Sequence, residues 1–183
     1  LREDAEVLGY TANFTIYDTD DQIKAMRQVV NEMNLSTKEY NPKLLLYSIE
    51  RAKRELVGPD RFGEKFSDTL EDPIASIAED AYKMYQKNLK ESNAMDFGDL
   101  LFLCVKLWQD NPDVLRKYQE RWKYVLVDEY QDTNYVQYEW CRLLVQKHKN
   151  LFVVGDDYQS IYAFRGADIS NILNFNKDYP EAE

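Results

Sequence analysis

The sequence predicts an α/β fold in which a predominantly helical segment is followed by a small parallel sheet. Residues 1–121 carry apolar side chains at helical spacing and contain no obvious strand. Residues 122–183 instead contain two short apolar runs, 124–127 and 151–154, separated by an amphipathic stretch at 135–147. Two strands that flank one helix are typical of a right-handed βαβ unit, in which the strands are parallel and buried.

Five helices are expected in the first part. Their apolar periodicity places them at about 20–34, 42–56, 74–85, 96–108 and 112–122. The run Thr19-Asp20-Asp21-Gln22 has the form of a capping box and would begin the first helix, whereas Pro42 would begin the second. The fourth helix is apolar on most sides, which predicts a central position.

The net charge of −10 argues against a chain that coats DNA through bulk electrostatics, because counterion release needs clustered Lys and Arg. Residues 41–65 come nearest to a basic stretch. Its cations are Lys43, Arg51, Lys53, Arg54, Arg61 and Lys65. A solvated helix face is the preferred interpretation of this stretch, and phosphate contact is the alternative.

No run of residues is apolar for long enough to span a membrane. The sequence begins at Leu1, without an initiator Met and without a signal-peptide pattern. We therefore expect a piece of a longer cytoplasmic protein without a membrane partner. Cys104 and Cys141 lie among apolar neighbours, which favours two buried reduced thiols over a disulfide. One His and no paired Cys spacing leave zinc without a ligand set.

Both predicted strands end in acidic residues. Asp128 and Glu129 follow the first strand, and Gly155-Asp156-Asp157 follows the second. The carboxyl ends of parallel strands form the edge where such sheets bind ligands. When the first acidic pair is taken alone, helix capping is the preferred explanation. The second acidic turn, at this spacing, favours a ligand site.

The blocks 125–134 and 155–168 resemble motifs II and III of the superfamily 1A DNA helicases, the UvrD/PcrA/Rep group, and Met95 to Leu101 extends the resemblance. The resemblance implies that residues 1–121 are a helical insert, the 1B-like subdomain. Residues 122–183 would be the returning part of a RecA-like P-loop NTPase sheet. The parent protein would couple hydrolysis of ATP with Mg²⁺ to 3′-to-5′ movement on single-stranded DNA and to unwinding at single-strand/duplex junctions.

The resemblance also assigns the nucleotide site. Asp128 would hold Mg²⁺, and Glu129 would be the base that activates the attacking water. Asp156 would lie near the metal shell and contribute to nucleotide binding. Gln159 would bind the γ-phosphate and change partners on hydrolysis, since a neutral amide both donates and accepts.

Further residues of the two blocks would connect this site with DNA. Tyr162 and Phe164 would stack on bases, with ordinary core packing as the alternative; the family most often has Trp in place of Phe164. Arg165 would contact the DNA backbone or, as we prefer, hold the Glu129 loop. Gln131 and Asp132 would link the nucleotide site to its neighbours, and capping of the next helix is a nearly equal alternative.

The phosphate-binding half of such a site is missing from the sequence. The Walker A pattern G-x-x-x-x-G-K-[ST] is absent, and residues 58–65 only approximate it, because Glu64 stands where Lys is needed and Pro59 removes an amide donor. We interpret this stretch as a loop between helices. The 183-residue chain alone is therefore expected to hydrolyse ATP negligibly.

Three alternatives remain open at this point. A helicase–nuclease subunit of the AddA or RecB kind shares both blocks, and a nuclease domain in the parent would identify it. A non-catalytic module for DNA or partner binding would be expected to have lost the acidic pair, which is intact here. A metal-dependent hydrolase could use clustered carboxylates. Its candidate ligands are Asp128, Asp132, Asp156 and Asp157.

Overall fold

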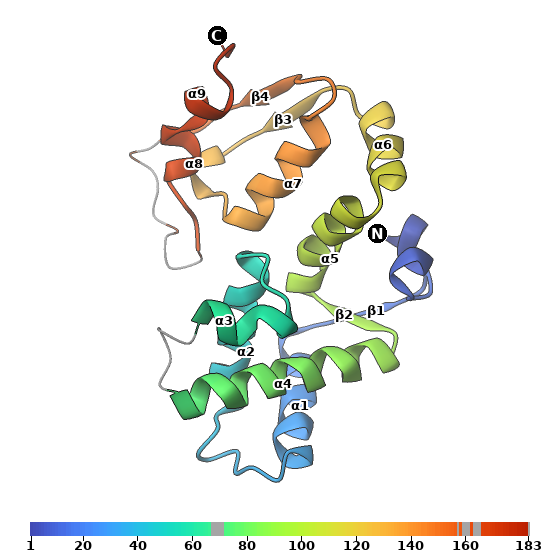
Figure 1. Cartoon of the computed structure of the whole chain (residues 1–183), viewed down its shortest axis with the longest axis vertical. Helices are drawn as coiled ribbons and strands as arrows, with labels where there is room; N and C mark the ends of the chain where they lie inside the picture. The colour runs from blue at the N-terminus through green and yellow to red at the C-terminus, as the bar shows by residue number, and fades with distance from the viewer. Residues whose placement is uncertain (67–71, 157, 159–161, 163–165, 183) are drawn as a thin grey trace. The chain divides into compact units, whose positions relative to one another are not determined.

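The computed structural model describes residues 1–66, 72–156, 158, 162 and 166–182 (Figure 1). The chain divides into two compact units, Leu1–Leu103 and Cys104–Glu183. Their boundary falls within helix α5 (Phe97–Asp110). The subdomain boundary expected at residue 121 stays a prediction. Among the described residues, no helix combines the length and apolarity that crossing a membrane requires.

The first unit consists of helices packed beside a small parallel sheet. Its elements are η1 (Arg2–Leu8), β1 (Thr15–Tyr17), α1 (Thr19–Glu32), α2 (Pro42–Arg54), η2 (Pro59–Arg61), α3 (Phe62–Phe66), α4 (Asp72–Glu91), β2 (Ala94–Asp96) and the first part of α5. The long helix α4 contacts both α1 and α2 around one apolar core. The five predicted helices are confirmed, since each matches one of α1, α2, α4, α5 and α6.

Three local predictions for this unit are wrong. The sheet of β1 and β2, which pair in parallel with Thr15 opposite Ala94, was not expected. Helix α1 is capped by Asp18, whose side chain accepts a hydrogen bond of 2.9 Å from the Asp21 amide, so the cap lies one residue before the predicted box. Residues 58–65 are not a loop, because they form η2 and most of α3.

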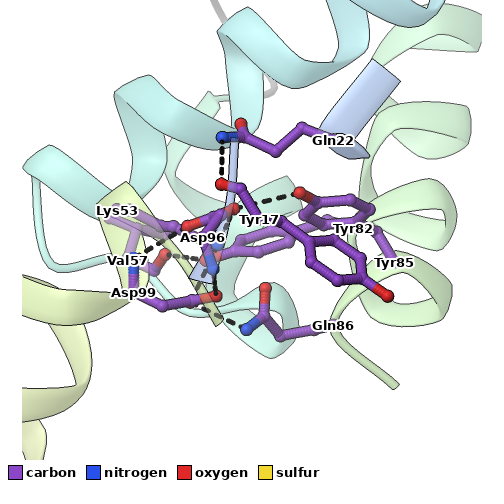
Figure 2. Close-up of polar contacts among 9 residues, drawn as sticks. All are labelled: Tyr17, Gln22, Lys53, Val57, Tyr82, Tyr85, Gln86, Asp96 and Asp99. Carbon is purple, nitrogen blue, oxygen red and sulfur yellow. Dashed lines mark hydrogen bonds and ion pairs between the residues drawn. The ribbon is translucent and has the colours of Figure 1, made fainter. Parts of the chain in front are cut away.

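A buried ion cluster joins α2, α4 and the start of α5 (Figure 2). Lys53 Nζ lies 2.7 Å from Asp96 Oδ2 and 2.8 Å from Asp99 Oδ1. Tyr85 donates from its hydroxyl to Asp96 over 3.1 Å, and Gln86 donates from Nε2 to Asp99 over 2.8 Å. Lys53 is only 1% exposed. The expectation that it belongs to a solvated face is therefore wrong, because two carboxylates compensate its charge inside the unit.

The same carboxylates cap α5. The Asp99 amide donates to Asp96 Oδ1, and the Asp96 amide donates to Asp99 Oδ2. A Cβ at Gly98 would lie 3.0 Å from Lys53 Cδ, so a glycine here lets the lysine stem approach the helix. Burial raises the pKa of the Asp99 carboxyl, Lys53 lowers it, and Asp96 raises it further. The result is a compact charge cluster that holds three helices together.

The second unit contains the predicted strand–helix–strand pattern. Its elements after α5 are α6 (Pro112–Arg121), β3 (Val125–Val127), η3 (Tyr130–Asp132), α7 (Tyr135–Val145), β4 (Leu151–Val153), α8 (Ser170–Leu173) and α9 (Phe175–Asp178). Strands β3 and β4 are parallel, with Val125 opposite Leu151, and α7 connects them (Figure 1). An α/β fold with parallel strands is thus confirmed.

The burial expected for both faces of these strands is not observed. Leu126 is 74% exposed and Phe152 is 61% exposed, whereas Val125 and Val127 are half-buried. Successive side chains of a strand point to opposite faces, so the described residues cover one face of this sheet and leave the other open.

Cys141 is expected to resist alkylation in the folded protein. Both Cys104 and Cys141 are thiols rather than halves of a disulfide, as predicted, although only Cys141 is fully buried. Burial raises the pKa of the Cys141 thiol from 9.0 to about 11. At about pH 8, the fraction of Cys141 that is thiolate should be roughly 100-fold lower than that of an exposed cysteine with the ordinary pKa. Iodoacetamide labelling of a Cys104→Ser variant should therefore be slow until denaturant is added, and equally fast labelling of the folded protein would contradict the prediction.

Candidate functional site

The two acidic turns lie at the same edge of the β3–β4 sheet. Asp128 and Glu129 directly follow β3, and Asp156 stands three residues after β4. The turns are tied by backbone hydrogen bonds, from Val154 N to Val127 O over 2.8 Å and from Tyr130 N to Val154 O over 2.9 Å. The side chains of all three acids are exposed. The register of the parallel strands therefore produces the arrangement that their spacing predicted.

Glu129 has an unusual backbone conformation. Its φ is +51°, in the left-handed region, which costs a residue with a side chain of the order of 1 kcal/mol or more. The other described non-glycine residues with positive φ follow the C-terminal ends of α1, α2, α4 and α7. Glu129 instead follows a strand. Such conformations persist where the surroundings enforce them, and they concentrate at functional sites.

Gln131 is fully buried and forms hydrogen bonds with both acidic turns. Its Nε2 donates to Glu129 Oε2 over 2.8 Å, and its Oε1 accepts from the Asp156 amide over 3.0 Å. One side chain therefore contacts both acidic turns. The linking role that the sequence resemblance implied for Gln131 stays a prediction.

Helix capping does not account for these residues. Helix α7 begins with a capping box formed by Asn134 and Gln137, in which each side chain accepts from the other residue's amide. The capping alternative is therefore wrong for Gln131. Asp132 does not cap α7 either, and its Oδ1 is buried without a hydrogen-bond partner in the part of the chain that the structure describes.

A second link joins the end of this turn to the residues that precede and begin α8. Asn171 Nδ2 donates to the Thr133 carbonyl over 3.0 Å, and the Asp168 amide donates to the same carbonyl over 2.9 Å. The Thr133 hydroxyl in turn donates to the Tyr130 carbonyl over 2.7 Å. Thr133 and Asn171 were not among the predicted site residues, because their residue types carry no signal for a contact across 38 positions.

The carboxylates at this edge are better suited to a magnesium ion that is also bound by a phosphate ligand than to a metal ion held by protein side chains alone. Within the described ranges, no three His, Cys, Asp or Glu side chains gather as a metal site would require. The alternative of a carboxylate-cluster hydrolase therefore finds no support there. Asp128 offers an exposed carboxylate at the strand end, with Oδ1 accepting from the Glu129 amide. Mg²⁺ usually takes one or two such carboxylates together with phosphate oxygens and water.

Several predicted site residues lie outside the described part of the chain. These are Asp157, Gln159, Phe164 and Arg165. Tyr162 is described and is half-buried, with its carbonyl accepting from the Ala167 amide over 3.3 Å. The structure therefore brings together Asp128, Glu129, Gln131 and Asp156, while the roles assigned to these and to the other site residues stay predictions.

Residues 1–180 match the protein family described as the UvrD/REP helicase N-terminal domain. The chain belongs to this family. It is 46% identical over 182 residues to the ATP-dependent DNA helicase PcrA of Leuconostoc citreum, a match that covers 100% of this chain and 24% of that protein. The ATP-dependent DNA helicase PcrA of Bacillus subtilis is 44% identical over 182 residues, which are 100% of this chain and 24% of that protein.

A further member, the probable DNA helicase II homolog of Rickettsia felis, is 47% identical over 175 residues, which are 96% of this chain and 26% of that protein. The chain thus spans about a quarter of the length of these relatives. The resemblance to UvrD-type helicases, inferred above from the two acidic blocks, is confirmed.

Proposed function

We propose that this chain is a section of a cytoplasmic ATP-dependent DNA helicase that moves 3′ to 5′ on single-stranded DNA and unwinds duplexes from junctions. The observation that supports this most directly is the acidic edge at Asp128 and Glu129, joined through Gln131 to the turn after β4. Relatives that carry the name ATP-dependent DNA helicase support the same proposal. Residues 1–121 would form the helical insert and residues 122–183 the returning motor segment.

In this proposal each residue has a distinct task. Asp128 holds the metal from the end of β3, and Glu129 orients the attacking water and accepts its proton. Bound Mg²⁺ supplies positive charge to the phosphate oxygens. Gln159 contacts the γ-phosphate, whereas Tyr162 and Phe164 stack on bases of single-stranded DNA.

Arg165 holds the Glu129 loop or contacts the DNA backbone. Asp156, whose carboxylate accepts from the Tyr158 amide over 3.0 Å, would lie near the metal when it is bound. The nucleotide phosphates require a Walker A loop, which these 183 residues do not contain.

The test compares the 183-residue chain with the longer protein that carries it. We expect the longer protein to hydrolyse ATP faster when single-stranded DNA is added, and to unwind a duplex with a 3′ tail but not one with a 5′ tail. The 183-residue chain should hydrolyse ATP only at the background rate. Robust ATP hydrolysis by the 183-residue chain would contradict the claim that it lacks the phosphate-binding part of the site. Unwinding from a 5′ tail would contradict the proposed 3′-to-5′ direction. A longer protein without any DNA-stimulated hydrolysis would instead favour a non-catalytic module.

A further inference from the structure

The contacts of Gln131 define which end of its amide faces which neighbour. The Asp156 amide can only donate, so Oε1 must face it, and the Glu129 carboxylate can only accept, so Nε2 must face that side. Both polar ends of a side chain that is 0% exposed are therefore satisfied. Asn would be too short for this bridge, Met would offer neither bond, and Glu would set a second carboxylate against Glu129.

The turn after β4 is shaped to receive this amide. A Cβ at Gly155 would lie 2.5 Å from Gln131 Oε1 and 2.7 Å from Ile172 Cδ1, so only a glycine permits the observed approach. The Asp156 amide then meets Oε1 at 3.0 Å. A displacement of this turn would remove the partner of Oε1 and free the amide to rotate.

The Glu129 side chain depends on the same amide. Its carboxylate is exposed, and its backbone is held in the left-handed region, so solvent alone would leave the side chain several orientations. The 2.8 Å hydrogen bond from Gln131 selects one of them. A buried neutral group thereby fixes an exposed charged one.

We propose that Gln131 is a positioning residue, which aims the Glu129 carboxylate at the attacking water and makes that aim depend on the position of the Gly155–Asp156 turn. This inference rests on the proposed function, because it takes Glu129 to be the base. A change in the turn after β4 would reach the base through one side chain. The residue acts through Glu129 and need not contact the nucleotide.

A double-mutant cycle in the longer protein tests the proposal. Gln131→Met is expected to lower kcat for DNA-stimulated ATP hydrolysis about 10- to 100-fold, with KM for ATP within about threefold. In the Glu129→Gln background the same substitution should lower kcat less than about twofold, because residues that act as one unit are not additive. An equal loss in both backgrounds would mean a merely structural role and would overturn the proposal.

Two further variants make the result independent of folding defects. Gln131→Glu keeps an acceptor for the Asp156 amide but repels Glu129, so its kcat should fall at least as far as that of Gln131→Met. Gln137→Met is the matched control: it removes a half-buried amide whose contact within the described residues is the α7 capping box, and kcat should stay within about twofold. Circular dichroism checks the fold, and a fluorescent ATP analogue with Mg²⁺ reports nucleotide affinity.

The outcomes distinguish a failure of the proposed base from a failure of the positioning role. If Glu129→Gln leaves hydrolysis unchanged, the assignment of the base fails, and the proposed chemistry fails with it. If Glu129→Gln abolishes hydrolysis but Gln131→Met and Gln131→Glu turn over at the wild-type rate, the positioning role alone is refuted.

Discussion

Replacing Glu129 by Gln in the longer protein is expected to lower kcat for DNA-stimulated ATP hydrolysis by about 10²- to 10⁴-fold, the usual contribution of a general base. The substitution keeps the size of the side chain and an oxygen that can accept from Gln131 Nε2, so the local structure should persist. It removes the capacity to take a proton from water. Steady-state hydrolysis at saturating single-stranded DNA measures the effect.

Binding should survive this substitution. The affinity for single-stranded DNA is expected to stay within about threefold of the wild-type value, since Glu129 contributes to chemistry rather than to DNA contact. Glu120→Gln serves as the control, because it alters an exposed carboxylate of the same unit that pairs with Lys147. Unchanged hydrolysis in Glu129→Gln would refute the assigned base, whereas a parallel loss of DNA binding would indicate a folding defect.

Replacing Lys53 by Met is expected to destabilise the chain by about 3–5 kcal/mol, because it leaves Asp96 and Asp99 buried without their cation. Met retains most of the apolar stem, so the loss reports the charge rather than a cavity. Urea unfolding followed by circular dichroism measures it. Lys87→Met is the matched control, since Lys87 pairs with Glu91 at 3.8 Å on an exposed helix face and should contribute less than about 1 kcal/mol.

The pH dependence of the Lys53→Met variant provides a second check. Burial raises the pKa of the Asp99 carboxyl, and loss of Lys53 removes the effect that opposes this rise. A carboxyl whose folded-state pKa exceeds its unfolded value adds stability below the unfolded pKa, and this is lost as the pH rises through the folded pKa. The variant should therefore regain stability as the pH falls from about 7 to about 4. A loss that grew on acidification would contradict the buried-charge explanation.

The helices could be predicted because their signals are local. Pro42 and Pro112 begin α2 and α6 at the positions expected, and apolar side chains recur at helical spacing along α1 and α4. The acidic strand ends were predictable for the same reason. Each apolar run and its acidic turn are contiguous, and parallel pairing then brings the two turns to one edge.

What could not be predicted depends on contacts between distant positions. Strands β1 and β2 have three residues each, too few for a periodic pattern, and Asp96 was attributed to the helix that follows. Lys53 resembles any cation of an amphipathic helix until Asp96 and Asp99 are seen beside it. Gln131 is compatible with a cap or a bridge, and only the register of β3 with β4 brings Asp156 within reach.

The parallel pairing of Thr15 with Ala94 also has a consequence for the order of folding. The two partners are separated by α1, α2, α3 and α4, so during synthesis β1 leaves the ribosome long before β2 exists. Closing so long a segment costs chain entropy that only prior packing of those helices can reduce. We therefore expect β1 and β2 to pair last, after the helices between them have packed, and their pairing then to stabilise that packed arrangement.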